Sequence, residues 1–285
     1  MWGETLKYNQ LKRTPLVTIQ TDTSDTALLY STRANICDLF RLMSTSHQPE
    51  HFENNGITRW RSVVPHSWFN GLIANEPPSP AREKVLAESL QYFQEKQVKE
   101  ITFWVDPAVQ LSDWSSVMSK YGFVYSKDTP GMALDLNELN TEIPNVDGLE
   151  IRVVEDVETC KLWSKVFTLG YGLPSAWEEM VFKSWGALGL VLPMRNYLGY
   201  LDGKPVATSC LFLGGGAAGM YSVSTVPEAR GKGIGAVMTV HPLLDAREMD
   251  YRIGTLQSSD MGFKIYQRLG FQHICQIEYF HKTIK

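Results

Sequence analysis

The sequence predicts an α/β protein of two similar halves, each a mixed, mostly antiparallel twisted sheet flanked by helices. Its 285 residues exceed the usual size of one domain. Its second half alternates strand-like and helix-like patterns, with the hairpin-forming dipeptide Asp202-Gly203 between two strands. Two dipeptides of the first half, Ala81-Arg82 and Gly122-Phe123, recur 148 positions later as Ala229-Arg230 and Gly270-Phe271. A tandem repeat explains both matches with one offset.

The composition is that of a soluble globular protein, with 44% hydrophobic and 20% charged residues. The formal net charge of -4 provides no broad positive field. We therefore expect neither nucleic acid nor a membrane surface as the partner, and a small ligand fits better.

The cysteines are far apart in the sequence and form no Cys-x-x-Cys pair, which argues against a zinc site and against a disulfide framework. His47 and His51 flank Pro49, which disfavours a helical metal pair, so we expect no metal. The segment after Met1 has no apolar run of signal-peptide length, so a cytoplasmic location is expected. The four cysteines are Cys37, Cys160, Cys210 and Cys275.

The second half gives a clear series of elements. A strand over Leu149 to Glu155 precedes a helix capped by Asp156, and a second helix covers Trp177 to Trp185. The remaining predicted elements are strands at Asn196 to Leu201, Lys204 to Leu213 and Ala217 to Thr225, a helix at Gly233 to Met249, a strand at Arg252 to Gln257, a helix at Met261 to Leu269 and a strand at Phe271 to His281.

The first half repeats part of this order, with a helix over Val85 to Phe93, a strand over Glu100 to Val105 and a helix over Asp113 to Lys120. The polar segment 141–148 contains Pro144 and a turn sequence, so we place the linker there. The predicted domains are residues 1–140 and 149–285.

Three glycines at alternate positions, Gly231, Gly233 and Gly235, lie between a strand end and a helix start. Glycines let backbone N–H groups turn toward a ligand, and the helix N-terminus adds partial positive charge. A pyrophosphate is the ligand such a loop suits best. Arg230 and Lys232 add flanking positive charge, although either side chain alone is as readily explained by exposure to solvent.

Two other phosphate-binding loops share some of these features. A Walker loop requires Gly-x4-Gly-Lys followed by Ser or Thr, which is absent here. Gly231-x-Gly233-x-x-Ala236 matches the dinucleotide fingerprint, and Asp260 follows at a suitable distance. Too few residues follow the loop to complete a doubly wound sheet, and the preceding hairpin implies antiparallel pairing.

The spacing Arg230-x-x-Gly233-x-Gly235 after a Val-x-Thr-x-Pro strand end resembles the coenzyme A loop of the GNAT acetyltransferase superfamily. The later segment Ser259 to Phe271, with Tyr266 before a Gly-Phe pair, resembles another motif of that family. The resemblance covers about 149–285 and departs from the common pattern at Ser259, where asparagine is frequent, and at Gly262, where alanine is frequent. Serine also caps helices well.

The resemblance implies an N-acetyltransferase that moves an acetyl or other acyl group from acetyl-CoA to a primary amine by direct attack, without a covalent enzyme intermediate. The acceptor is a small molecule or a protein amine. Tyr266 would be the general acid beside the sulfur. The expected cofactor-binding residues are Val223, Ser224, Thr225, Arg230, Gly231, Lys232, Gly233, Ile234, Gly235, Ala236 and Ser259. A non-catalytic acyl-CoA sensor is the alternative.

The first half is expected to be a degenerate GNAT-like copy. The 148-residue offset places Glu83, Val85 and Ala87 where the second half has its three glycines, and Met118 where it has Tyr266. Side chains there crowd the backbone cradle, Glu83 repels a pyrophosphate, and Met118 has no proton to donate. This copy should therefore wall the acceptor site or serve the structure alone.

The general base is not assigned. Glu178 and Glu179 lie on the helix that borders the acceptor site in this family, but paired glutamates on a helix are usually a solvated face. Tyr171, Trp177 and Trp185 are candidates for an acceptor pocket, although aromatic residues at helical spacing more often belong to a core.

Overall fold

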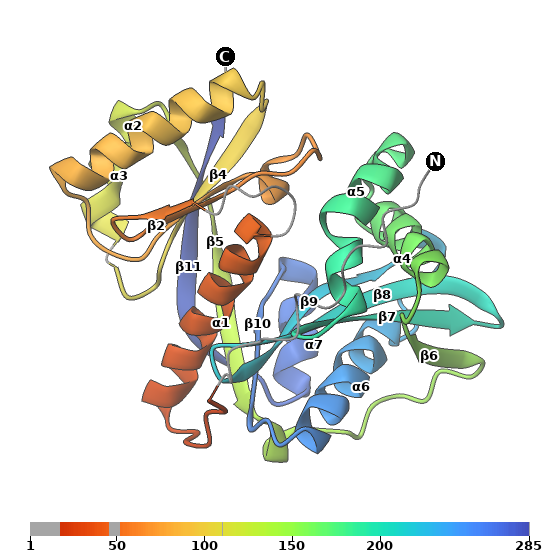
Figure 1. The fold of residues 1–285 in the computed structure, drawn as a ribbon. Helices are drawn as coiled ribbons and strands as arrows, with labels where there is room; N and C mark the ends of the chain where they lie inside the picture. Colours follow the sequence, from red (N-terminus) through yellow and green to blue (C-terminus); the bar gives the residue numbers. More distant parts are fainter. Residues whose placement is uncertain (1–17, 46–51, 110, 285) are drawn as a thin grey trace.

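One continuous eleven-stranded sheet forms the centre of the molecule, in the order β1-β2-β3-β4-β11-β5-β10-β9-β8-β7-β6 (Figure 1). The computed structural model describes residues 18–45, 52–109 and 111–284. Neighbouring strands pair antiparallel except at β3–β4 and β9–β10, which are parallel. The predicted mixed, mostly antiparallel sheet flanked by helices is therefore confirmed.

The elements of the first half are α1 (Asp25–Thr45), β1 (Phe52–Asn54), β2 (Ile57–Trp60), η2 (Ser67–Phe69), β3 (Gly71–Ala74), α2 (Pro80–Glu95), β4 (Glu100–Val105), α3 (Leu111–Lys120), β5 (Val124–Asp135) and η3 (Leu136–Glu138). Those of the second half are β6 (Leu149–Val153), α4 (Val157–Gly170), η4 (Ser175–Trp177), α5 (Glu178–Ser184), η5 (Gly186–Leu190), β7 (Met194–Leu201), β8 (Lys204–Gly214), β9 (Ala217–Thr225), η6 (Pro227–Ala229), α6 (Ile234–Glu248), β10 (Ile253–Gln257), α7 (Asp260–Arg268) and β11 (Gln272–Thr283).

The predicted elements of the second half are all present, with ends shifted by a few residues at most. Local chemistry explains several boundaries. Asp156 caps α4 by accepting from the Thr159 backbone N–H at 2.7 Å, and Ser259 caps α7. Asp202 and Gly203 both have positive φ in the hairpin between β7 and β8, as a tight hairpin turn requires.

The two halves exchange their last strands. β11 lies between β4 and β5, and β5 lies between β11 and β10 (Figure 1). The structure thus differs from the expectation of a separate sheet in each half, because the last strand of each half pairs with strands of the other half. An exposed strand edge is a template for unwanted pairing, and this exchange covers two such edges. The predicted linker, 141–148, lies between the two halves along the chain, but a single sheet contains strands of both halves.

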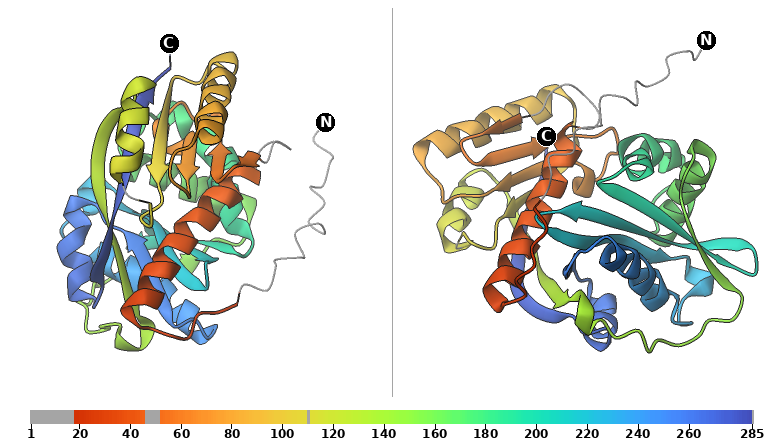
Figure 2. Two further views of the ribbon diagram at one scale, coloured as in Figure 1. Left: turned by 90° about the vertical axis from the view of Figure 1, so that its left-hand side faces the viewer. Right: turned by 60° about the horizontal axis from the view of Figure 1, so that its bottom comes forward.

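Helix α1 packs along the seam between the halves and contacts strands of both (Figures 1 and 2). The Asn35 side chain donates to the carbonyls of Phe212, Gly214 and Ala217 at the β8–β9 hairpin, and Asp38 accepts from the Gly215 N–H at 2.8 Å. These bonds therefore fix α1 to the second half, although the helix belongs to the first half of the chain.

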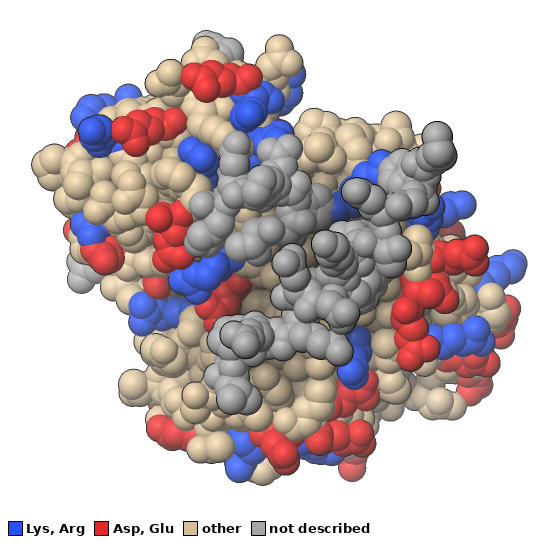
Figure 3. Space-filling model, viewed as in Figure 1, with Lys and Arg blue, Asp and Glu red and all other residues tan. Residues whose placement is uncertain are grey.

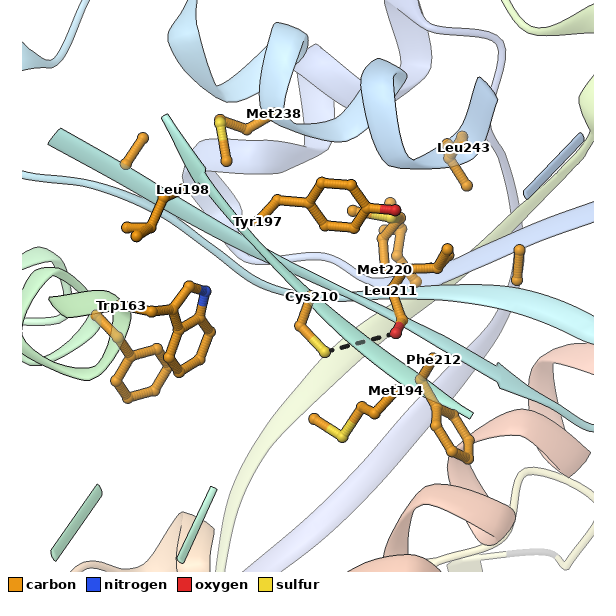
Figure 4. Close-up of a cluster of buried hydrophobic side chains, with 14 of the residues drawn as sticks. Trp163, Met194, Tyr197, Leu198, Cys210, Leu211, Phe212, Met220, Met238 and Leu243 are labelled. Atoms are coloured by element: carbon orange, nitrogen blue, oxygen red, sulfur yellow. Dashed lines mark hydrogen bonds between the residues drawn. The ribbon is translucent and has the colours of Figure 1, made fainter. Parts of the chain in front are cut away.

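The core of the second half has two layers, one on each face of the sheet. Tyr197 lies on the α6 side with Met238 and Leu243, whereas Trp163 comes from α4 on the opposite side (Figure 4). The Tyr197 hydroxyl donates to Asp245 of α6 at 2.7 Å, and the Trp163 indole donates to the Ser209 carbonyl at 3.2 Å. These buried polar groups are satisfied, and they fix both helices on the strands.

Charged side chains of both signs are interspersed on the face shown in Figure 3, with no broad region of one sign. Within the described ranges no helix is long and apolar enough to cross a membrane. The same ranges contain no cluster of three His, Cys, Asp or Glu side chains suited to a metal ion. His47 and His51 lie outside the described residues.

Candidate active site

The glycine turn between β9 and α6 presents a row of free backbone donors. Gly231 and Gly233 have positive φ, at 78° and 85°, and α6 begins after Gly233 without a side-chain cap. In the described structure no protein group accepts from the N–H groups of residues 231–235. A Cβ added at Gly231 or Gly235 meets no atom within 4 Å. The turn is therefore an open cradle of amides at a helix N-terminus, which suits an anion such as a pyrophosphate.

Arg230 fixes this turn to its surroundings. Its guanidinium donates to the carbonyl of Thr225, at the end of β9, at 3.0 Å, and to that of Gly170, at the end of α4, at 2.8 Å. The sequence predicted only flanking positive charge from Arg230, whereas in the structure its guanidinium binds two carbonyls of its own chain. Arg230 positions the cradle and contributes its charge there at the same time, whereas the exposed Lys232 does not line the cavity described below.

Strands β9 and β10 separate beyond Met220. Their parallel pairing covers only Ala218, Gly219 and Met220 of β9. From there 221–225 stay paired with β8 alone. The backbone groups on the free side of this segment face the opening, where an extended amide chain can pair with them as an added strand.

A β-bulge shapes the same segment. Ser222, with φ of 54°, and Val223 together face a single residue of β8, which bends and twists the strand. The Trp185 indole donates to the Ser222 hydroxyl at 2.9 Å, and the Thr208 hydroxyl donates to the Ser222 carbonyl at 2.9 Å. The bulge is thus held from both sides and turns Val223 toward the opening.

Tyr266 lies on α7 on the other side of the opening. Burial raises the pKa of its hydroxyl to about 12, and a side-chain interaction with Thr239 partly opposes this. The ring packs edge-on against Phe271 at 5.9 Å between centroids. Because the hydroxyl keeps its proton at any ordinary pH, it can donate a proton and cannot serve as a base in the resting protein.

A cavity of about 1140 Å³ joins these features. It runs from the glycine turn, past the free segment of β9 and Tyr266, to aromatic side chains of both halves. Because α1 and α4 supply one end and α6 and α7 the other, the cavity passes through the gap between β9 and β10. The predicted site residues that line it are Val223, Ser224, Thr225, Arg230, Gly231, Gly233, Ile234, Gly235, Ala236, Ser259 and Tyr266.

Of the other residues considered for the acceptor side, Tyr171 and Trp185 line the cavity. Trp177 lies outside it and packs near His66, and Glu178 and Glu179 are also outside the lining. Glu179 pairs with Lys183 one turn along α5 at 3.2 Å, as expected for a solvated helix face.

Several lining residues escaped the sequence analysis. The segment 140–144 runs beside the glycine turn, with Pro144 3.7 Å from a Cβ placed at Gly233. Gln257, at the end of β10, also lines the cavity, and its Nε2 is buried. The missed residues from the first half and β11 include Ile36, Leu39, Phe40, Met43, Trp68, Phe69, Trp104, Thr129 and Tyr279.

No protein-family model and no curated protein matches the sequence. Solved structures do match. A GCN5-related N-acetyltransferase from Kribbella flavida is 17% identical with a TM-score of 0.65, over 90% of this chain and 95% of that one. A GCN5-related N-acetyltransferase from Sphaerobacter thermophilus is 16% identical with a TM-score of 0.59, over 80% of this chain and 76% of that one.

A tandem GNAT protein from the clavulanic acid biosynthesis pathway matches 94% of this chain and 98% of its own length. It is 14% identical, with a TM-score of 0.55. The alignment spans both halves. The chain has the GNAT fold.

The first half of this GNAT fold has no glycine turn. Helix α2 begins at Pro80, directly after its cap Ser79, whereas α6 begins only after the turn at Gly233. The Glu83 N–H, counterpart of the Gly231 N–H, donates to the Ser79 carbonyl at 2.8 Å. Helical hydrogen bonding starts early because no glycine interrupts it, so this amide is no longer free for an anion.

Arg82 supports the 148-residue offset. It donates to the Pro77 carbonyl at 2.9 Å, just as Arg230 donates to the Thr225 carbonyl five residues before it. Arg82 lies inside α2, which begins at Pro80 and therefore earlier than the helix predicted over Val85 to Phe93. It also forms an ion pair with Glu76.

Trp114 fills the core of the first half between α3 and the end of β3. It is fully buried at the position equivalent to Gly262, and its indole donates at 3.0 Å to the carbonyl of Glu76, the counterpart of Ser224. Met118, the counterpart of Tyr266, is fully buried in the same core. None of the residues that line the cavity belongs to α2 or α3.

We expect Trp114→Ala to lower the free energy of unfolding by roughly 3–5 kcal/mol, because the side chain is buried in a core. It should create no second acetyl-CoA site, since the α2 amides remain occupied. Chemical denaturation and calorimetric stoichiometry measure the two effects. The control Trp68→Ala, at a tryptophan that is 43% exposed, should cost under about 1 kcal/mol. Two acetyl-CoA molecules per Trp114→Ala chain would contradict this assignment.

Proposed function

We propose that this protein is an acyl-CoA-dependent N-acyltransferase that uses acetyl-CoA and a primary amine. One observation carries the proposal: a single cavity connects the open amide cradle, the free segment of β9 and Tyr266 with a pocket on the other face of the sheet. Two substrates can therefore enter from opposite faces and meet in the gap between β9 and β10. The GNAT fold and the resemblance of both motifs support the same function.

In this proposal the free backbone N–H groups of residues 231–235 donate to the pyrophosphate, and the helix dipole of α6 favours its negative charge. The backbone N–H groups of Val223 and Thr225 donate to the amide chain that leads to the thioester. The thioester carbonyl then lies near the bulge, where a backbone N–H can stabilise the developing oxyanion.

The reaction is a direct transfer. The amine nitrogen attacks the thioester carbon, a C–N bond forms, and the C–S bond breaks. The leaving thiolate takes the proton of the Tyr266 hydroxyl, and the proton lost by the amine nitrogen restores the tyrosine through solvent. No side chain forms a covalent intermediate, and both substrates are bound together.

A thiol-release assay tests this function. Acetyl-CoA with the protein should release free coenzyme A only when a primary amine is present, and the amide should form in equal amount. Tight binding of acetyl-CoA without thiol release for any amine would favour the alternative, a non-catalytic acyl-CoA sensor. Thiol release that does not depend on amine would indicate hydrolysis and contradict amine transfer.

A further inference from the structure

Aromatic side chains from both halves surround the far end of the cavity, away from the glycine turn. Trp104 of β4 stacks on Tyr279 of β11, with ring centroids 4.5 Å apart and 23° between planes, and Phe40 of α1 lies 5.5 Å from Trp104. Trp68 meets Tyr171 edge-on at 5.7 Å. These five rings all line the cavity, so flat apolar walls face its interior.

The strand exchange creates this end of the cavity. Tyr279 and Trp104 are paired across β11 and β4, which are neighbours only because β11 leaves its own half. The first half therefore supplies a wall of the site and not only a support for it.

The charged side chains of the lining lie elsewhere. Among the described lining residues the charged ones are Glu142, Arg230 and Arg268. Arg230 holds the glycine turn, while Glu142 lies on the segment that Asn140 fixes to the Arg268 carbonyl at 3.0 Å. No described carboxylate or histidine lines the aromatic end, so a polycationic acceptor finds no counter-charge there.

An apolar site also changes the amine itself. Burial in low dielectric disfavours the charged form and lowers the pKa of an amine, so the acceptor nitrogen enters as the neutral nucleophile.

We infer that one substrate carries an aromatic group, attached to the amine or to the acyl carbon, and that this group packs between Trp68, Trp104 and Tyr279. Either source gives an amide with an aromatic end, which the apolar walls recognise by stacking and by burial of its surface. The inference rests on the proposed function, since it concerns the substrates of the same reaction.

Four substrate pairs test the inference by thiol release. Acetyl-CoA with ethylamine is the reference, and acetyl-CoA with spermidine is the polycationic pair. Acetyl-CoA with 2-phenylethylamine and phenylacetyl-CoA with ethylamine carry the ring on the amine and on the acyl group. At least one aromatic pair should exceed both the ethylamine reference pair and the spermidine pair in kcat/KM by roughly tenfold to a hundredfold. The faster aromatic pair identifies the source of the ring.

Trp68→Ala should lower kcat/KM for the preferred aromatic pair by about tenfold relative to kcat/KM for the ethylamine pair, and leave acetyl-CoA affinity unchanged. Tyr125→Ala removes an aromatic side chain of similar exposure, 45% against 43%, outside the cavity, and should change none of these values. Calorimetric binding of the amide product of the preferred pair, N-(2-phenylethyl)acetamide or N-ethyl-2-phenylacetamide, should be weakened by Trp68→Ala and gives a readout without turnover.

Equal or faster reaction of the spermidine pair would overturn the aromatic preference and leave the acyltransferase function intact. Absence of thiol release with every pair, despite acetyl-CoA binding, would instead refute the proposed function and the inference with it.

Discussion

Tyr266→Phe should lower kcat by roughly 10² to 10⁴-fold, the usual worth of a positioned proton transfer, while the Kd for acetyl-CoA changes little. The change removes only the hydroxyl, and the ring keeps its contact with Phe271. Since burial raises the pKa of this hydroxyl to about 12, it stays protonated throughout the assay range. Wild-type activity should therefore show no alkaline loss between about pH 6 and 10, and the rise in that range should follow deprotonation of the amine.

The matched control is Tyr171→Phe. Tyr171 also lines the cavity, and its hydroxyl lies 3.5 Å from the Val223 carbonyl. Burial raises the pKa of this hydroxyl as well. We expect less than a tenfold loss of kcat in Tyr171→Phe. Full activity of Tyr266→Phe with loss of activity in Tyr171→Phe would show that the acid assignment is wrong.

Gly235→Trp should lower the affinity for acetyl-CoA at least about a hundredfold, since its side chain fills the amide cradle. Gly235 lacks positive φ, and its Cβ position is free of atoms within 4 Å, so the fold should tolerate the change. Gly233 is a poorer choice because its φ of 85° strains any other residue. Calorimetry measures the affinity, and thermal unfolding checks that the chain still folds.

The repeat offers the control for this variant. Ala87 is the counterpart of Gly235 in the first half and lies on the exposed face of α2. Ala87→Trp should leave one acetyl-CoA site per chain with unchanged affinity. Equal binding by Gly235→Trp and the wild type would refute the cradle, and a loss of binding in Ala87→Trp would refute the idea of a silent first copy.

Local patterns predicted much of the second half because its elements depend on nearby residues. The hairpin dipeptide Asp202-Gly203, the cap Asp156 and the glycines of the turn each act within a few positions, so periodicity and spacing reveal them. The 148-residue offset likewise predicts a first copy, and the shared carbonyl bonds of Arg82 and Arg230 agree with that register.

Contacts between distant parts of the chain could not be predicted in this way. The alternation of β11 indicates a strand but not that its neighbours are β4 and β5. The aromatic end of the cavity depends on that pairing and on α1, a helix that the sequence analysis did not assign. Trp114 belongs to no sequence motif. Its importance shows only when the 148-residue offset pairs it with Gly262 and the structure shows its indole bonded to the Glu76 carbonyl. The role of a single residue was also incompletely predicted. Arg230 was expected only to add positive charge, but it also binds two carbonyls of its own chain.

We expect coenzyme A to lie in the second half, with its sulfur in the gap between β9 and β10 and beside Tyr266 of α7. A crystal structure of the protein with coenzyme A bound measures this directly. We expect one molecule per chain, its pyrophosphate on the amides of residues 231–235 and its sulfur within roughly 3.5–4 Å of the Tyr266 hydroxyl. Coenzyme A at the start of α2, or a sulfur far from Tyr266 and Val223, would contradict the account.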